Sequence, residues 1–101
     1  MSDFAFRAPL WRWNGGSATT WHFVTMPSDM AIEVRLRSMT SRRGFGSVRV
    51  EARIGGSLFR TSLFPMSSAD SYLLPVKAAV RRAEGIGDGD EAHVELTLLD
   101  A

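Results

Sequence analysis

Apolar and polar side chains alternate along much of the chain, and this pattern predicts short β-strands. The clearest run spans residues 48–54, where valine, alanine and isoleucine alternate strictly with Arg49, Glu51 and Arg53. Residues 92–98 show the same alternation. Because successive side chains of a strand point to opposite faces, each run has one face suited to a hydrophobic core and one suited to solvent.

Glycine-rich turns divide the other strand-like segments into hairpins. The tripeptide Gly-Gly-Ser occurs at residues 15–17 and again at residues 55–57, and such sequences favour tight hairpin turns. Pro65 is expected to end the second hairpin, because proline cannot donate a hydrogen bond to a neighbouring strand. The predicted strand pairs are 4–13 with 19–26, and 48–54 with 58–64.

Residues 28–37 carry conflicting signals. Ile32, Val34 and Leu36 alternate with charged residues, as in a strand. Ser28, by contrast, is a good N-cap, and apolar side chains four positions apart favour a helix. Our interpretation is a short helix.

A second short helix is expected after Pro75, which is well suited to a helix start. Val76, Ala79, Val80 and Ala83 recur at helical spacing and are expected to dock on the rest of the domain, and Gly85 is expected to adopt a left-handed conformation just past the helix end. With a short strand at 71–74, the count is about six strands and two short helices. Short strands leave open edges unless the sheet closes, so the sequence predicts one mostly β domain over residues 1–101, folded as a small closed barrel.

Composition narrows the setting of this domain. The chain has 101 residues, a hydrophobic fraction of 45%, a net charge of +1 and no cysteine. Disulfides and thiolate metal sites are therefore excluded, which fits a reducing, cytoplasmic location. We expect no membrane span, because the apolar runs are far shorter than the ~18–20 residues that a span needs.

Catalytic and cofactor motifs are missing from the sequence. The two histidines, His22 and His93, lie in predicted strands, outside any recognisable nucleophile or metal-ligand spacing. The alternating glycines at 85, 87 and 89 follow a helix, whereas a dinucleotide-binding loop precedes one. We predict no catalytic residues, no metal and no cofactor.

Five segments occur in an order that is typical of one protein family. They are Leu10-Trp11, Arg43-Gly44-Phe45-Gly46-Ser47-Val48, Ile54-Gly55-Gly56, Thr61-Ser62-Leu63-Phe64-Pro65 and Leu74-Pro75-Val76-Lys77-Ala78-Ala79-Val80-Arg81. Together they resemble the bacterial family named domain of unknown function 1905. The resemblance implies a closed six-stranded double-split β-barrel, a fold otherwise known from transition-state-regulator and antitoxin DNA-binding proteins. It implies no activity.

Candidate binding residues combine positive charge with aromatic surface. Lys77 and Arg81 are one helical turn apart, and Arg43 lies in a glycine-flanked loop, so the three could form an anion site if the barrel brings them together. Trp11 and Trp21 could supply the walls of a ligand site at the barrel mouth. For these two residues, and for Trp13, Phe59 and Phe64, the period-two spacing first of all favours the alternative of packing in the barrel interior.

The leading hypothesis is a non-catalytic binding module for a small anionic or amphipathic molecule. DNA binding is the alternative, suggested by the fold and by the mid-chain arginines, although an isoelectric point of about 8.4 and interspersed glutamates disfavour nucleic acid. An uncharacterised enzyme ranks third. The sequence leaves open whether the protein is a monomer or a homodimer.

Overall fold

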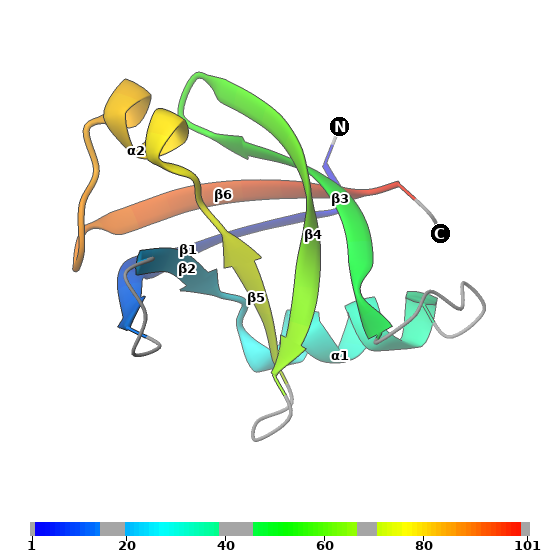
Figure 1. Cartoon of the computed structure of the whole chain (residues 1–101). Coiled ribbons are helices and arrows are strands. Elements are labelled where there is room, and N and C mark those ends of the chain that lie inside the picture. Colours follow the sequence, from blue (N-terminus) through cyan, green and yellow to red (C-terminus); the bar gives the residue numbers. More distant parts are fainter. Residues whose placement is uncertain (1, 15–19, 39–45, 67–70, 100–101) are drawn as a thin grey trace.

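A computed structural model of the chain describes residues 2–14, 20–38, 46–66 and 71–99, and within them six antiparallel strands close into a barrel (Figure 1). The strand order around the barrel is β1-β2-β5-β4-β3-β6. The fold predicted from the sequence, a mostly β six-stranded barrel with two helices, is confirmed. The elements are β1 (Phe4–Asn14), β2 (Thr20–Thr25), α1 (Ser28–Ser38), β3 (Val48–Ile54), β4 (Ser57–Met66), β5 (Ser71–Pro75), α2 (Ala78–Glu84) and β6 (Glu91–Leu98).

Two strands change partners along their length, and this closes the barrel. Residues 4–9 of β1 pair with β6, whereas residues 10–14 pair with β2. In the same way, residues 57–63 of β4 pair with β3 and residues 64–66 pair with β5. The barrel is thus two half-sheets that share β1 and β4.

Aliphatic side chains dominate the barrel interior. The largest fully buried ones come from all six strands, the segment after β2, and α1: Leu10, Met26, Leu63, Leu74, Leu96, Val24, Val34, Val50 and Val94. Trp13 and Trp21 do not fill the core, because they are about half exposed, at 48% and 46%. The core-packing alternative for Trp21 is therefore wrong: Val24 and Leu10 occupy the inward positions of β2 and β1, which turns the aromatic residues outward.

The first helix is confirmed, and it lies along one end of the barrel (Figure 1). It begins at Ser28 and buries Ala31 and Val34. The strand-like alternation in this segment arises because Ile32 and Leu36 point to solvent, with exposed fractions of 52% and 61%.

The second helix begins three residues later than expected and lies near the opposite end of the barrel (Figure 1). Pro75 is the last residue of β5 and pairs with Phe23, so it does not start the helix. Of the side chains expected to dock, Val76 is buried ahead of the helix and Val80 packs partly against the core, but Ala79 and Ala83 are exposed.

Hydrogen bonds at its C-terminal end hold α2 in place. Gly85 caps the helix with φ 65°, as predicted, and the Ile86 backbone N–H donates to the Arg81 carbonyl at 3.1 Å. Glu84 accepts from the Gly56 backbone N–H at 3.2 Å and from the Ser57 hydroxyl at 2.5 Å. The helix is thereby attached to the β3–β4 hairpin.

Pro65 does not end its strand as expected, because β4 continues to Met66 and Pro65 pairs with Tyr72. Pairing with β3 has already ended at Leu63, so only one side of β4 needs backbone donors there. The predicted turn at residues 15–17 lies outside the described residues.

The β3–β4 turn offers a test of the attachment of α2. Gly55 has φ 59°, and a Cβ atom there would collide with the Glu84 carboxylate. Gly55→Ala should therefore lower the free energy of unfolding by about 1–2 kcal/mol, through backbone strain and displacement of Glu84. Denaturation in urea measures the change. The neighbouring Gly56→Ala, whose Cβ would meet nothing within 4 Å, should change it by less than about 0.5 kcal/mol; equal effects of the two substitutions would contradict this account.

Candidate functional site

A cavity of about 420 Å³ opens where β4 and β5 separate and α2 begins. We call it the α2 cleft. Its volume falls within the range of about 300–1,000 Å³ that is usual for small-molecule sites. Its lining comes from β2, β4, the end of β5 and the start of α2: Thr20, Trp21, His22, Thr61, Phe64, Pro75, Val76, Lys77, Ala78 and Arg81.

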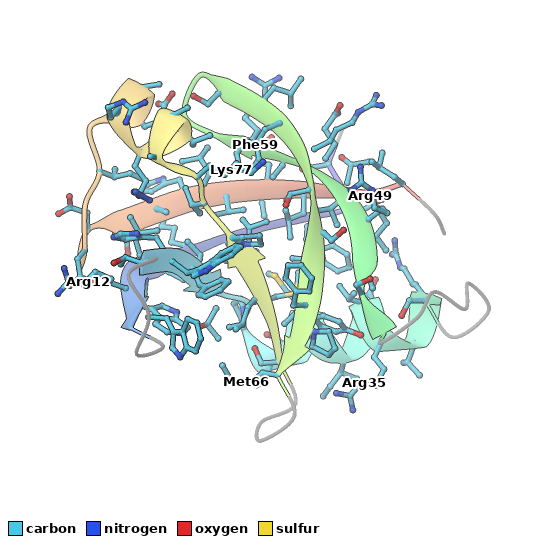
Figure 2. The ribbon with its side chains drawn as sticks, in the orientation of Figure 1. Arg12, Arg35, Arg49, Phe59, Met66 and Lys77 are labelled. Carbon is cyan, nitrogen blue, oxygen red and sulfur yellow. The ribbon has the colours of Figure 1, made fainter. Side chains whose placement is uncertain are left out.

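Two cations from the helical segment line the α2 cleft. Lys77 is the N-cap residue of α2, with an exposed side chain, and Figure 2 shows it beside the start of this helix. Arg81 lies one turn further on, and its guanidinium donates to the Val76 carbonyl at 3.2 Å. Among the described residues, neither cation forms a salt bridge, and the lining contains no carboxylate. The cleft is therefore positively charged.

The aromatic walls come from the outer faces of two strands. Trp21 of β2 and Phe64 of β4 are 46% and 44% exposed, and both line the α2 cleft. Trp11 does not line it, because its indole lies further along the sheet and donates from Nε1 to the Thr25 hydroxyl at 2.9 Å. Arg43 lies outside the described residues.

His22 is a cleft residue that the sequence did not single out. Its backbone carbonyl accepts from the Val76 N–H at 2.9 Å, which holds β2 against the segment that leads into α2. Its Nδ1 is buried and has no hydrogen-bond partner among the described residues. Burial lowers the pKa of His22 below the ordinary 6.5, and the charge of Arg81 lowers it further. The charge of Asp88 acts in the opposite direction and raises this pKa, and Arg12 adds a smaller lowering. The neutral form of the imidazole is therefore favoured.

A model of a known protein family matches nearly the whole chain. Residues 6–96 match the model described as domain of unknown function, DUF1905. The chain belongs to this family. A search of curated proteins gives no match. All described cleft residues of this DUF1905 domain lie inside the matched range.

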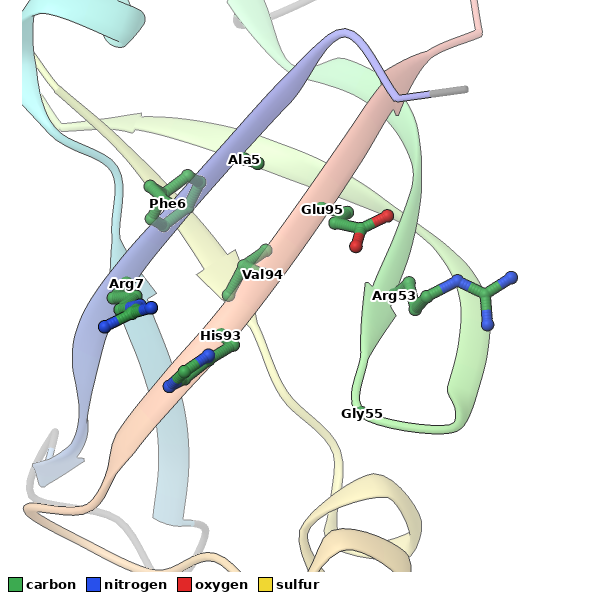
Figure 3. Close-up of a pocket in the computed structure, with 8 residues that line it drawn as sticks. All are labelled: Ala5, Phe6, Arg7, Arg53, Gly55, His93, Val94 and Glu95. Atoms are coloured by element: carbon green, nitrogen blue, oxygen red, sulfur yellow. The ribbon is translucent and has the colours of Figure 1, made fainter.

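A second cavity of about 370 Å³ lies on the outer side of β1 and β6, beside the β3–β4 turn (Figure 3). Its charged lining residues are of both signs, since Arg53 and Glu95 occupy paired positions of β3 and β6 and Arg7 lies nearby on β1. It contains none of the residues predicted from the sequence. This second cavity contains the Glu95 carboxylate, and the one aromatic residue in its described lining, Phe6, is buried. It therefore suits an anion with an apolar body less well than the α2 cleft does.

The mid-chain arginines of the DUF1905 domain that can be placed come from two different elements, α1 and β3. Arg37 lies on α1, is paired with Glu33 and Asp3, and covers the ring of Phe4. Arg49 lies on β3 and donates to the Ser62 hydroxyl at 3.5 Å. Such dispersed, partly neutralised arginines give little support to DNA binding.

Catalytic geometry is also missing from the described part of the chain. Neither histidine there is hydrogen-bonded to a serine or threonine hydroxyl, and His93 instead lies 3.5 Å from the Glu91 carboxylate. No cluster of three or more histidine or acidic side chains suited to a metal ion occurs in these ranges. Within the same ranges, no helix is both long enough and apolar enough to cross a bilayer.

The sequence identified part of the α2 cleft. Lys77 and Arg81 were visible from their helical spacing, whereas Trp21 was named as a candidate wall although the spacing of the aromatic residues favoured core packing for it. His22, Thr61 and Val76 were missed, because their convergence depends on where β4 leaves β5.

The lowered pKa of His22 predicts a pH dependence of stability. Below pH 6.5 the unfolded chain protonates this histidine more readily than the folded chain, so the free energy of unfolding should fall as the pH is lowered. His22→Gln should remove this component and flatten the decline between about pH 7 and pH 5 in urea denaturation. His93→Gln, which replaces an exposed histidine outside the α2 cleft, is the matched control and should leave in place the part of the decline that comes from His22. An unchanged decline in His22→Gln would show that another group is responsible.

Proposed function

We propose that the chain is a non-catalytic binding protein whose α2 cleft takes a small anion with an apolar body. One observation carries the proposal: Lys77 and Arg81 share a mainly apolar cavity with Trp21 and Phe64. Ligand sites typically combine apolar walls with a few converging polar groups, and this cavity has that composition.

Charge balance favours an anionic ligand. The two cations project into a lining that has no carboxylate among its described residues, so the positive charge is not neutralised from within the cleft. An anion there would gain charge-assisted hydrogen bonds from an ammonium and a guanidinium. The guanidinium of Arg81 is already oriented by its bond to the Val76 carbonyl, which lowers the entropy lost on binding.

In the part of the chain that the structure describes, no hydroxyl is hydrogen-bonded to a histidine that could act as its base, which supports a binding role over an enzymatic one. Thr20 and Thr61 line the cleft together with His22, but neither hydroxyl is hydrogen-bonded to the imidazole. Hydroxyl activation requires such a contact to a base. The neutral His22 instead contributes a polar, uncharged wall.

The test compares naphthalene-2-carboxylate with its neutral analogue 2-naphthalenemethanol by titration calorimetry. The carboxylate should bind more tightly, and Lys77→Ala should weaken its binding about three- to fivefold, as expected for an ion pair that remains partly in water. Raising the salt concentration should reduce the difference between the wild-type chain and the variant.

Arg82→Ala is the matched control, since Arg82 is exposed on the same helix, carries the same charge and does not line the cleft. It should leave the affinity within about a factor of two of the wild-type value. An equal loss of affinity in both variants would mean that the ligand responds only to the overall positive charge of the helix. If neither the carboxylate nor any other member of a panel of amphipathic anions binds, the proposed function is wrong.

A further inference from the structure

The walls of the α2 cleft are stiff and flat on one side. Trp21 stacks on Phe23 with ring planes 7° apart and centroids 6.1 Å apart. The ring centroids of Phe23 and Trp11 are 5.4 Å apart, and Trp11 is fixed by its hydrogen bond to Thr25. Trp21 is therefore one end of a row of three rings, and the other two hold its indole plane before any ligand arrives.

From this row we infer that the α2 cleft selects planar aromatic anions over flexible aliphatic ones, an inference that rests on the proposed function. Phe23 covers one side of Trp21, yet the indole remains 46% exposed and lines the cleft. A flat ring can continue the stack on the exposed indole surface. Phe64 of β4, also half exposed, bounds the same space.

The rest of the lining favours a rigid ligand for the same reason. Pro75, Val76 and Ala78 have few or no rotatable side-chain bonds, so the cleft cannot reshape itself around a flexible chain. A flexible ligand loses its own rotamer freedom on binding, whereas a fused ring system has little to lose. Lys77 and Arg81 then hold the anionic group beside the stacked ring.

The experiment measures the affinities of two pairs of anions by titration calorimetry. Each pair matches a flat anion with a flexible one of the same charge and carbon count: naphthalene-2-carboxylate with undecanoate, and 2-naphthyl phosphate with decyl phosphate. The flat member should bind about three- to tenfold more tightly in at least one pair, which is the gain typical of an aromatic stacking contact. The pair that shows the larger preference identifies the anionic group.

Substitution of Trp21 separates stacking from charge. Trp21→Leu should abolish the preference for the flat anions while leaving the affinity for the flexible ones within about a factor of two, and Trp21→Phe, which retains a ring, should restore part of the preference. Trp13→Leu is the matched control. Trp13 pairs with Trp21 across β1 and β2 and is equally exposed, at 48%, but does not line the cleft.

The outcomes distinguish the inference from the proposed function. Equal affinities within both pairs, tighter binding of the flexible anions, or a preference that survives in Trp21→Leu would overturn the inference and leave the proposed function standing. Absence of binding by all four anions to the wild-type chain would overturn both. Loss of the preference in Trp13→Leu to the same extent as in Trp21→Leu would also overturn it, because the stacking surface would then lie outside the cleft.

Discussion

The change of partner within β1 is the constraint on which the rest of the structure depends. At this point the Leu10 N–H donates to the Asp90 carbonyl, and the Leu10 carbonyl accepts from the Gly89 N–H, at 2.8 and 2.7 Å. These bonds place the turn before β6 against the middle of β1, so that β6 pairs with one half of the strand and β2 with the other. A sheet of six short strands closes only if such a change occurs, because otherwise its two edge strands would expose unpaired backbone groups. Pro9, which has no N–H, sits where the first of these pairings ends.

The α2 cleft forms where β4, the other strand that the two half-sheets share, changes its pairing partner. β4 pairs with β3 as far as Leu63 and with β5 from Phe64 onward, whereas β5 continues beside β2 as far as Pro75. The space between the diverging strands cannot be filled by strand pairing, and the start of α2 lies over it. Residues from β2, β4 and α2 therefore meet there although they are far apart in the sequence. The aromatic side chains at its rim are exposed because Val24 and Leu63 already occupy the inward positions of β2 and β4.

The sequence predicted the strands well where one face is apolar and the other charged, as in residues 48–54 and 92–98. Closure into a barrel was inferable from the open edges and from the resemblance to a family. The orientation of β1 and β2 was ambiguous, since Leu10 and Val24 on one face and Trp11 and Phe23 on the other are all apolar, and alternation alone does not say which face is inside. Pro65 and Pro75 were misjudged because the effect of a proline depends on which side of the strand has a neighbour. The cleft depends on these registers, so only its helical cations, at i and i+4, could be predicted.

The position of Lys77 and Arg81 depends on a helix that packs weakly. α2 has seven residues and buries none of them, so its own propensity and packing contribute little stability. Its place is set by polar contacts at each end: Glu84 with the β3–β4 turn, Gly85 as the C-cap, and Arg81 with the Val76 carbonyl. Arg81 therefore serves both the cleft and the helix, and an anion that drew its guanidinium away from Val76 would weaken the helix that carries it. Lys77 makes no such contact among the described residues. The two cations are thus unequal: Arg81 is pre-oriented by the fold, whereas Lys77 is free to follow the charge of a ligand.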